Sequence, residues 1–243
     1  MVPVSLLSIE GLSKSFSGIH AVRDVTLDVA EHEFLGIIGP NGAGKTTLFS
    51  LLSGEQRPTE GRVIFDGTDI TGWSADKIAR HGLVRTFQLM RPFESMSVLE
   101  NVTIAALTKR RSRKDARAHA LEVLDRVQLS DQVGGKVSTM STAGLKRLEL
   151  ARALAMEPRV VLLDEVLAGL VPAERAPMID LLRTLHGQGQ TVLFVEHIMA
   201  AVMALSERLV VMHEGAVLLS GEPRTVIEDS RVIEAYLGEE APA

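Results

Sequence analysis

The sequence predicts an α/β fold in which a parallel sheet carries a helical insert. Short apolar runs, typical of strands buried on both faces, alternate with helical segments in the second half of the chain. A glycine-rich segment stands between another such run and a helix. A stretch with helical character falls between about Met90 and Glu157. Together these observations predict a strand–helix core interrupted by a smaller helical region.

The alternation is clearest toward the C-terminus. Each predicted strand there is rich in β-branched and aliphatic residues, and each predicted helix has good helix formers or apolar residues at helical spacing. The predicted strands are Arg159–Leu163, Thr191–Val195 and Leu209–Met212, and the predicted helices between them are Pro172–His186 and Met199–Leu205. This order indicates parallel strands joined by helical crossovers.

The N-terminal region predicts a separate antiparallel sheet. Val4–Ile9 and Ala21–Leu27 are expected to be strands, and Ser13–Gly18 is expected to be the turn between them. The alternating apolar residues of the second strand fit a sheet with one buried face. Phe16 falls in the predicted turn, and its spacing alone favours a loop anchor that packs on the core.

Two strands, Arg62–Asp66 and Gly82–Phe87, are predicted before the helical insert. The segment Gln88–Phe93 then forms a loop that is unusually rich in apolar side chains. Two interpretations of it stay open, a lining against the next subdomain and a docking groove for a partner. Within the insert, helical patterns cover Val98–Leu129 and Gly144–Met156.

A cationic run, Lys109–Lys114, lies inside the first of these helical patterns. A solvated loop or helix face is the favoured interpretation, and attraction to acidic lipid headgroups is the alternative.

Composition narrows the classes of function. Aromatic residues are 4% of the 243-residue chain and the formal net charge is −5, which disfavours a nucleic-acid-binding protein. The chain has no cysteine, which excludes disulfides and thiolate chemistry. No apolar run approaches the roughly 18–20 residues that span a bilayer. We therefore expect a soluble domain, with any membrane role being peripheral.

The glycine-rich segment has the pattern GxxxxGK[ST] and follows the predicted strand Phe34–Ile38. Glycines that tolerate positive φ let successive backbone N–H groups point at phosphates, and the following helix N-terminus favours negative charge. Lys45 is expected to contact the β- and γ-phosphates, Thr46 to bind Mg²⁺ and Thr47 to lie near the α-phosphate. The complete predicted phosphate loop is Gly39, Pro40, Asn41, Gly42, Ala43, Gly44, Lys45, Thr46 and Thr47.

Polar residues that follow other strands complete a predicted phosphate site. Asp164 and Glu165 come directly after a buried strand, where parallel sheets present their ligands. Asp164 is expected to hold Mg²⁺ through its water shell, and Glu165 to take a proton from an attacking water. His197 follows another strand and is a candidate contact for the γ-phosphate. Gln88 also follows a strand and offers an amide to water and Mg²⁺.

The order of these motifs resembles the ATP-binding subunit of ABC transporters, over nearly the whole chain. It consists of the phosphate loop, Gln88, Met140–Gly144 before a helix, Asp164–Glu165 and His197. The likeness is strongest to the ATPase subunits of branched-chain amino acid importers. The segments that suggest this are Val84–Gln88, Val166–Leu170, Val195–His197 and Val232–Gly238.

The resemblance implies a P-loop NTPase (RecA-like) core with an antiparallel β subdomain and a helical subdomain, the ABC nucleotide-binding domain. The core and β subdomain would cover residues 1–89 and 157–243, and the helical subdomain with its signature segment residues 90–156. It implies ATP and Mg²⁺ as ligands. Phe16 matches an aromatic residue that stacks on adenine, and Gln88 one that senses Mg²⁺ and nucleotide. Asp164, Glu165 and His197 match the metal-site acid, the general base and the γ-phosphate switch.

The resemblance also implies partners. Two ATPase subunits would close head-to-tail, with each ATP held between one phosphate loop and the signature of the other subunit, here Ser141, Ala143 and Gly144. The pair, either a homodimer or a heterodimer, would power membrane permease subunits. A periplasmic or lipid-anchored solute-binding protein would take part indirectly. The location would be peripheral, on the cytoplasmic face of the plasma membrane, with no role for nucleic acid.

The sequence departs from the family pattern at the signature. The common form is LSGGQ, whereas Ala143 stands here in place of the second glycine and Gly144 in place of glutamine. If the nucleotide-bound form needs a left-handed turn here, Ala143 resists it and we expect Gly144 to take it one residue later. Ile198 replaces the common aspartate after the histidine, and Ala168–Val171 lacks an aspartate that many relatives have.

Other functions fit less well. A kinase or a GTPase would share only the phosphate loop and would leave Gln88, Glu165 and His197 unexplained. For the transported solute, an amide, urea, another amino acid or an exported compound is the alternative to branched-chain amino acids.

Overall fold

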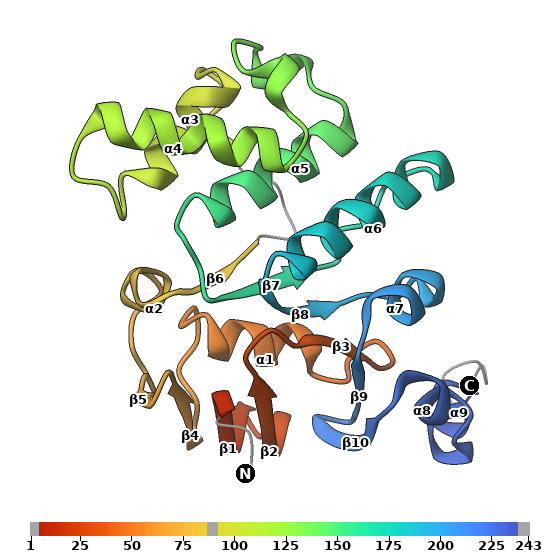
Figure 1. Ribbon diagram of the computed structural model, residues 1–243. Coiled ribbons are helices and arrows are strands. Elements are labelled where there is room, and N and C mark those ends of the chain that lie inside the picture. Colours follow the sequence, from red (N-terminus) through yellow and green to blue (C-terminus); the bar gives the residue numbers. More distant parts are fainter. Residues whose placement is uncertain (1–4, 87–91, 238–243) are drawn as a thin grey trace. The chain divides into compact units, whose positions relative to one another are not determined.

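The computed structural model describes residues 5–86 and 92–237, which form two compact units (Figure 1). The first unit contains the described parts of residues 1–78 and 191–243, and the second contains those of residues 79–190. The short helix α2 (Ala75–His81) lies at the junction between these ranges. The subdomain boundaries expected at residues 90 and 156 remain a prediction.

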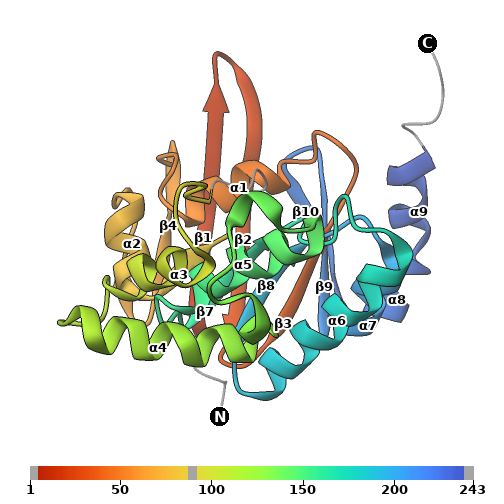
Figure 2. The ribbon, with the colours of Figure 1, turned by 90° about the horizontal axis from the view of Figure 1, so that it is seen from above.

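An antiparallel sheet forms one part of the first unit, as predicted. Its strand order is β2-β1-β4-β5. The first two strands are longer than expected and form a tall hairpin (Figure 2) with positive φ at both turn residues, Ser17 (45°) and Gly18 (91°). Phe16 is therefore the last residue of a strand, paired with Ile19, and its placement in a broad turn was wrong. The strands are β1 (Ser5–Phe16), β2 (Ile19–Ala30), β4 (Glu60–Phe65) and β5 (Thr68–Asp69).

A second group of strands in this unit carries the phosphate loop. The order is β10-β9-β3-β8, with β3 parallel to both of its neighbours and β10 antiparallel to β9. Every residue of β3 and β8 is buried, which confirms the interpretation of these apolar runs as interior strands. The strands are β3 (Phe34–Ile38), β8 (Thr191–Val195), β9 (Arg208–His213) and β10 (Ala216–Gly221).

Four helices belong to the described part of the first unit. The helix that follows the phosphate loop was predicted, and so was α7, with the bounds that the structure gives. No helix was predicted near the C-terminus, where the segments are short. The helices are α1 (Lys45–Leu52), α7 (Met199–Leu205), α8 (Pro223–Ile227) and α9 (Ser230–Leu237).

The second unit consists of one parallel strand pair and a set of helices. β6 (Leu83–Arg85) pairs with β7 (Val160–Asp164). The long helical pattern of the insert is in fact two helices. The intervening residues 107–112 include part of the cationic run, and Ser112 caps the second helix by accepting a hydrogen bond from Asp115 N at 3.1 Å. The helices are α3 (Val98–Ala106), α4 (Arg113–Arg126), α5 (Thr142–Leu154) and α6 (Pro172–Gly187), with short 3₁₀ turns at Ser130–Gln132 and Val137–Thr139.

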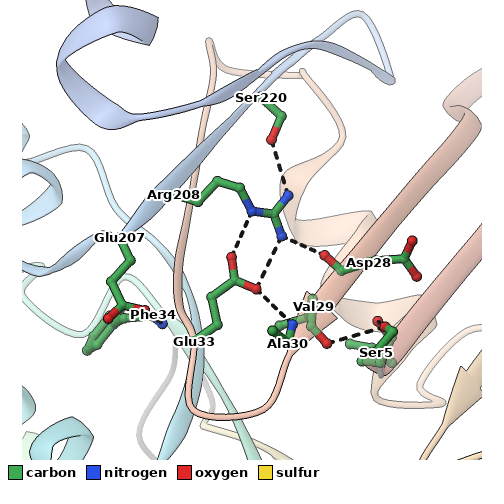
Figure 3. Close-up of polar contacts among 10 residues, drawn as sticks. Ser5, Asp28, Val29, Ala30, Glu33, Phe34, Glu207, Arg208 and Ser220 are labelled. Carbon is green, nitrogen blue, oxygen red and sulfur yellow. Dashed lines mark hydrogen bonds and ion pairs between the residues drawn. The ribbon is translucent and has the colours of Figure 1, made fainter. Parts of the chain in front are cut away.

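A partly buried ion pair connects the two sheets of the first unit (Figure 3). Arg208 of β9 donates from Nε to Glu33 Oε1 at 2.7 Å and from Nη2 to the Asp28 carbonyl oxygen at 2.5 Å. Its Nη1 is 3.3 Å from Ser220 Oγ on β10. Glu33 Oε2 in turn accepts from Ala30 N at 2.8 Å. One guanidinium therefore joins β9, β10, β2 and the turn between β2 and β3.

We expect Glu33→Gln to lower the free energy of unfolding by about 1–3 kcal/mol, because the hydrogen bonds of Arg208 would lose their charged acceptor. Urea denaturation of the purified protein measures this change. The matched control is Glu10→Gln, since Glu10 pairs with Arg62 at 2.7 Å with both side chains well exposed. Its expected cost is below about 1 kcal/mol. Equal effects of the two substitutions would contradict a special role for the Arg208–Glu33 pair.

Candidate nucleotide-binding site

The phosphate loop runs from the end of β3 to the start of α1 and requires glycine at two closely packed positions. Gly39 has φ 149° and Gly44 has φ 96°. A Cβ atom on Gly39 would lie 2.0 Å from the Met212 carbonyl oxygen, and one on Gly44 would lie 2.3 Å from the Ala21 carbonyl oxygen. Any larger residue would therefore push the loop away from strands on either side of it. These positions support the sequence-based interpretation of the glycines.

Main-chain hydrogen bonds hold the same loop in place. Gly215 N, in the turn between β9 and β10, donates to Ala43 O at 3.1 Å. Gly215 O accepts from Arg23 N of β2 at 2.7 Å, so the turn bridges the loop and the antiparallel sheet. Within the loop, Ala43 N donates to Pro40 O at 3.2 Å. The loop backbone is thus fixed by neighbours from both sheets of the first unit.

The cationic side chain of the loop lies inside its curve. Lys45 is 6% exposed, and its Nζ donates to the carbonyl oxygens of Gly39 at 2.5 Å and Pro40 at 2.8 Å. No side chain of the described residues caps the N-terminus of α1 at Gly44. Asn41 and Gly42 are exposed, as is Thr46. An uncapped helix N-terminus beside an ammonium group can bind an anion such as phosphate.

Strand register brings His197 to the same sheet edge as the phosphate loop. Ile37 of β3 lies opposite Val195 of the parallel strand β8. His197 and Gly39 each follow two residues beyond this pair, and parallel strands end at a common edge. His197 is exposed, and its backbone N–H donates to the carboxylate of the buried Glu196 at 3.2 Å. The first unit therefore gathers two of the predicted site elements.

Phe16 does not pack in the core. Its side chain is 42% exposed at the end of β1, so the interpretation as a loop anchor was wrong. Lys14 Nζ lies 5.0 Å from the centroid of its ring. An exposed aromatic ring of this kind can stack on a planar ligand such as a nucleobase.

In the second unit, Asp164 is the last residue of the buried strand β7. Its Oδ2 lies 2.6 Å from Arg85 Nη2, and the two side chains are 1% and 7% exposed. None of the residues that the structure describes forms a hydrogen bond with the other carboxylate oxygen, Oδ1. Buried oxygens normally have a partner, so this one is a candidate contact for a water or an ion.

Glu165 follows in a left-handed backbone conformation with φ 49°. This region is uncommon for a residue other than glycine and often marks functional sites. The side chain is half-buried. Lys146 of α5, which is 6% exposed, donates from Nζ to the Glu165 carbonyl oxygen at 3.1 Å. A second buried cation therefore contacts the main chain of the predicted base.

Sequence reasoning missed both of these cations. Arg85 stands in the predicted strand Gly82–Phe87, and Lys146 in the predicted helix Gly144–Met156. A basic residue at a buried position was the available signal, because such charges are rarely buried without a partner. Whether Arg85 and Lys146 contact Asp164 or Glu165 depends on how the strands and helices pack. The spacing of these residues along the chain does not predict it.

The signature segment begins α5. Ser141 is the N-cap residue, and its Oγ accepts from Gly144 N at 3.1 Å. Ala143 and Gly144 both lie in the first helical turn, and neither has positive φ. The turn expected of Gly144 in the nucleotide-bound form therefore stays a prediction, and in this structure Gly144 is helical. The Ser141 side chain satisfies one N–H of this helix end, which explains why the helix starts at Thr142, two residues earlier than predicted.

The residues in place fit a Mg²⁺ ion held jointly by protein and phosphate. Magnesium prefers oxygen ligands and is often bound by one or two side chains together with substrate phosphates. Taken unit by unit, the candidate ligands are Thr46, which is exposed, in the first unit and Asp164 in the second, whose Oδ1 has no hydrogen-bond partner among the described residues. Residues 5–86 and 92–237 contain no group of three or more histidine, cysteine, aspartate or glutamate side chains that could hold a metal alone. Gln88, the third predicted ligand, lies outside the described residues.

Comparison with known proteins identifies the family. Residues 22–168 match the ABC transporter family. The chain is 39% identical to the high-affinity branched-chain amino acid transport ATP-binding protein BraF of Pseudomonas aeruginosa, over 96% of this chain and 98% of that one. It is 37% identical to LivG of Escherichia coli, which has the same description, over the same shares of the two chains.

A solved structure agrees with these relatives. The ADP conformation of an ATP-binding cassette of an ABC transporter superposes with a TM-score of 0.88 at 30% identity, covering 97% of this chain and 99% of that one. Among the described helices, none is long and apolar enough to cross a membrane. The fold, the phosphate loop and these similarities show that the chain belongs to the ABC transporter family, as an ATP-binding and ATP-hydrolysing subunit.

Proposed function

We propose that this ATPase powers the import of branched-chain amino acids. The observation that carries this proposal is the similarity to BraF and LivG along almost the whole of all three chains. The protein would work at the cytoplasmic face of the plasma membrane as a peripheral subunit, bound to permease subunits that receive solute from a separate binding protein. An importer of an amide, urea or another amino acid, or an exporter, is the alternative.

In this proposal the first unit binds most of the nucleotide. Lys45 leaves its loop carbonyls for the β- and γ-phosphates, and backbone N–H groups from Gly39 to Thr47 surround the phosphate oxygens. The exposed ring of Phe16 stacks on adenine. His197 contacts the γ-phosphate from the end of β8, at the edge where the loop begins. Each role uses a group that the structure leaves exposed or that has a movable side chain.

The second unit supplies the acids. Asp164 is proposed to hold Mg²⁺ with Thr46 and Gln88, and bound Mg²⁺ would neutralise charge on the β- and γ-phosphate oxygens. Glu165 is proposed to accept a proton from the attacking water, which raises the nucleophilicity of its oxygen. The left-handed backbone at Glu165 supports this role, because strain of this kind persists where surrounding contacts fix a residue for function.

The signature segment would act on the ATP of a second subunit. The N-terminus of α5 presents backbone N–H groups near Ser141, Ala143 and Gly144, and a helix N-terminus attracts phosphate. The hydroxyl of Ser141 is exposed and already oriented by its capping hydrogen bond. The partner would be either another copy of this chain or, as we propose, a different ATPase subunit.

A groove between α3 and α5 is the proposed docking site for the permease. Phe93 and Ile104 line it with 44% and 38% of their surfaces exposed, and Arg152 lies 5.5 Å from the Phe93 ring centroid. The fully buried Asn101 fixes the backbone here, accepting from Phe93 N at 2.8 Å and donating to Phe93 O at 3.1 Å. An apolar rim on a rigid frame suits a helix from a membrane subunit.

The solute assignment is tested with the natural complex, purified with its permease subunits and reconstituted into vesicles with its binding protein. We expect ATP-driven uptake of leucine, isoleucine and valine. Lys45→Ala should abolish it by removing the only full positive charge in the phosphate loop. The substitution Lys77→Ala removes an equal charge from an exposed position of α2 and should leave uptake unchanged. Uptake of urea or amides without leucine, or transport outward, would overturn the assignment.

Glu165→Gln should bind ATP as the wild type does and yet lose hydrolysis by about 10²–10⁴-fold, because an amide cannot accept the proton. Phosphate release and nucleotide titration measure the two properties on the same preparation. Glu60→Gln, at an exposed position of β4, is the matched control and should change neither property. A hydrolysis rate near that of the wild type would remove Glu165 from the role of general base.

Another expectation concerns the partner subunit. Ala143 is helical and half-buried, so its methyl costs no backbone strain but adds bulk where a glycine would let phosphate approach closely. We expect the permease to transport faster with a mixture of this chain and a co-encoded ATPase that has an unaltered signature than with this chain alone. Transport and hydrolysis rates of both assemblies test this. If the chain alone is as fast as the mixture, its altered signature is fully competent.

A further inference from the structure

The Asp164 carboxylate is fixed by a neighbouring strand. In the parallel pair β6–β7, Arg85 lies opposite Leu162, two residues before Asp164. From there the Arg85 side chain reaches the strand end, where Nη2 contacts Asp164 Oδ2 at 2.6 Å. Both side chains are almost completely buried. Only one carboxylate oxygen is used, and Oδ1 has no hydrogen-bond partner among residues 5–86 and 92–237.

We propose that Arg85 is a positioning residue that holds the Asp164 carboxylate in the orientation needed for Mg²⁺. This inference rests on the proposed role of Asp164 as the metal-site acid. Arg85 binds Oδ2, and Oδ1 remains for the ion or a water of its shell. Partners of this kind orient metal-binding carboxylates, and their loss typically weakens metal binding about 10–100-fold.

The backbone around this pair is fixed as well. Thr86, the residue after Arg85, donates from its backbone N–H to Leu162 O at 2.9 Å, and its hydroxyl lies 3.5 Å from Asp164 N. Consecutive residues of the β6 segment therefore hold the strand that leads to Asp164 and the Asp164 side chain. This arrangement leaves the carboxylate little freedom to rotate.

A purely structural role explains the pair poorly. Removing two charges from water costs free energy that their attraction often fails to recover, so a buried ion pair is weak evidence for stability. Apolar residues of similar size would fill the same space. The guanidinium group is planar and always charged, and it binds a carboxylate oxygen in a defined direction. This property is useful where the orientation of the carboxylate matters.

The test measures the Mg²⁺ concentration needed for half-maximal tightening of ATP binding, in a Glu165→Gln background so that no hydrolysis occurs. Arg85→Met keeps the length of the side chain and removes its charge. We expect this variant to need about 10–100-fold more Mg²⁺, while ATP binding in EDTA stays unchanged. Arg85→Lys keeps the charge without the planar group, and a smaller rise is expected.

The control is Arg208→Met, the same substitution in the partly buried pair with Glu33. It should lower stability without changing the Mg²⁺ requirement. An unchanged or lower requirement in Arg85→Met would overturn the proposal, and the lower value would mean that Arg85 competes with the ion. If Arg85→Met does not fold, Arg85→Lys decides by the same criterion.

The variant Asp164→Asn distinguishes a failure of the proposed role of Arg85 from a failure of the proposed role of Asp164 as the metal-site acid. If Asp164→Asn leaves the Mg²⁺ requirement unchanged, Asp164 is not the metal-site acid and both proposals fail. If Asp164→Asn raises the requirement and Arg85→Met does not, only the role of Arg85 is wrong.

Discussion

The close approach of the phosphate loop to its neighbours is the constraint on which the site depends. A loop that binds several phosphate charges must point its backbone N–H groups inward. This requires positive φ angles, which residues with a Cβ atom rarely adopt. Gly39 and Gly44 meet carbonyl oxygens of β9 and β2 at distances that leave no room for a Cβ atom. Strands β9 and β2 thus enclose the loop from two sides and fix its backbone.

The two acids of the second unit are each in an energetically unfavourable state. Asp164 is a buried negative charge, and Glu165 has a backbone conformation that few residues adopt. Arg85 pairs with the Asp164 carboxylate and so stabilises the buried charge. Lys146 binds the main-chain carbonyl of Glu165 and so stabilises its backbone conformation. Neither contact uses the atom that would carry out the chemistry. The site can therefore be rigid before any ligand binds, which is the condition for electrostatic preorganisation.

Much of this could be predicted from the sequence, for a physical reason. Strands buried on both faces and crossover helices have strong local patterns, so Thr191–Val195 and Met199–Leu205 were predicted with the bounds observed. The phosphate loop and the two adjacent acids were predicted because motif and context are both local. The error at Phe16 arose where a hairpin register decides the conformation, and α5 starts earlier than predicted because a helix cap decides where it begins. Arg85 was missed because its partner is 79 residues away.

The position of Arg85 also connects the proposed docking groove with the proposed metal-site acid. Its side chain lines the groove between α3 and α5 and at the same time holds the carboxylate at the end of β7. Because the interior is closely packed, a helix that fills this groove would press on the Arg85 side chain that holds Asp164. A permease segment bound there would then act on the metal-site acid through one side chain. This short connection requires no rearrangement of the strands and lies entirely within the second unit.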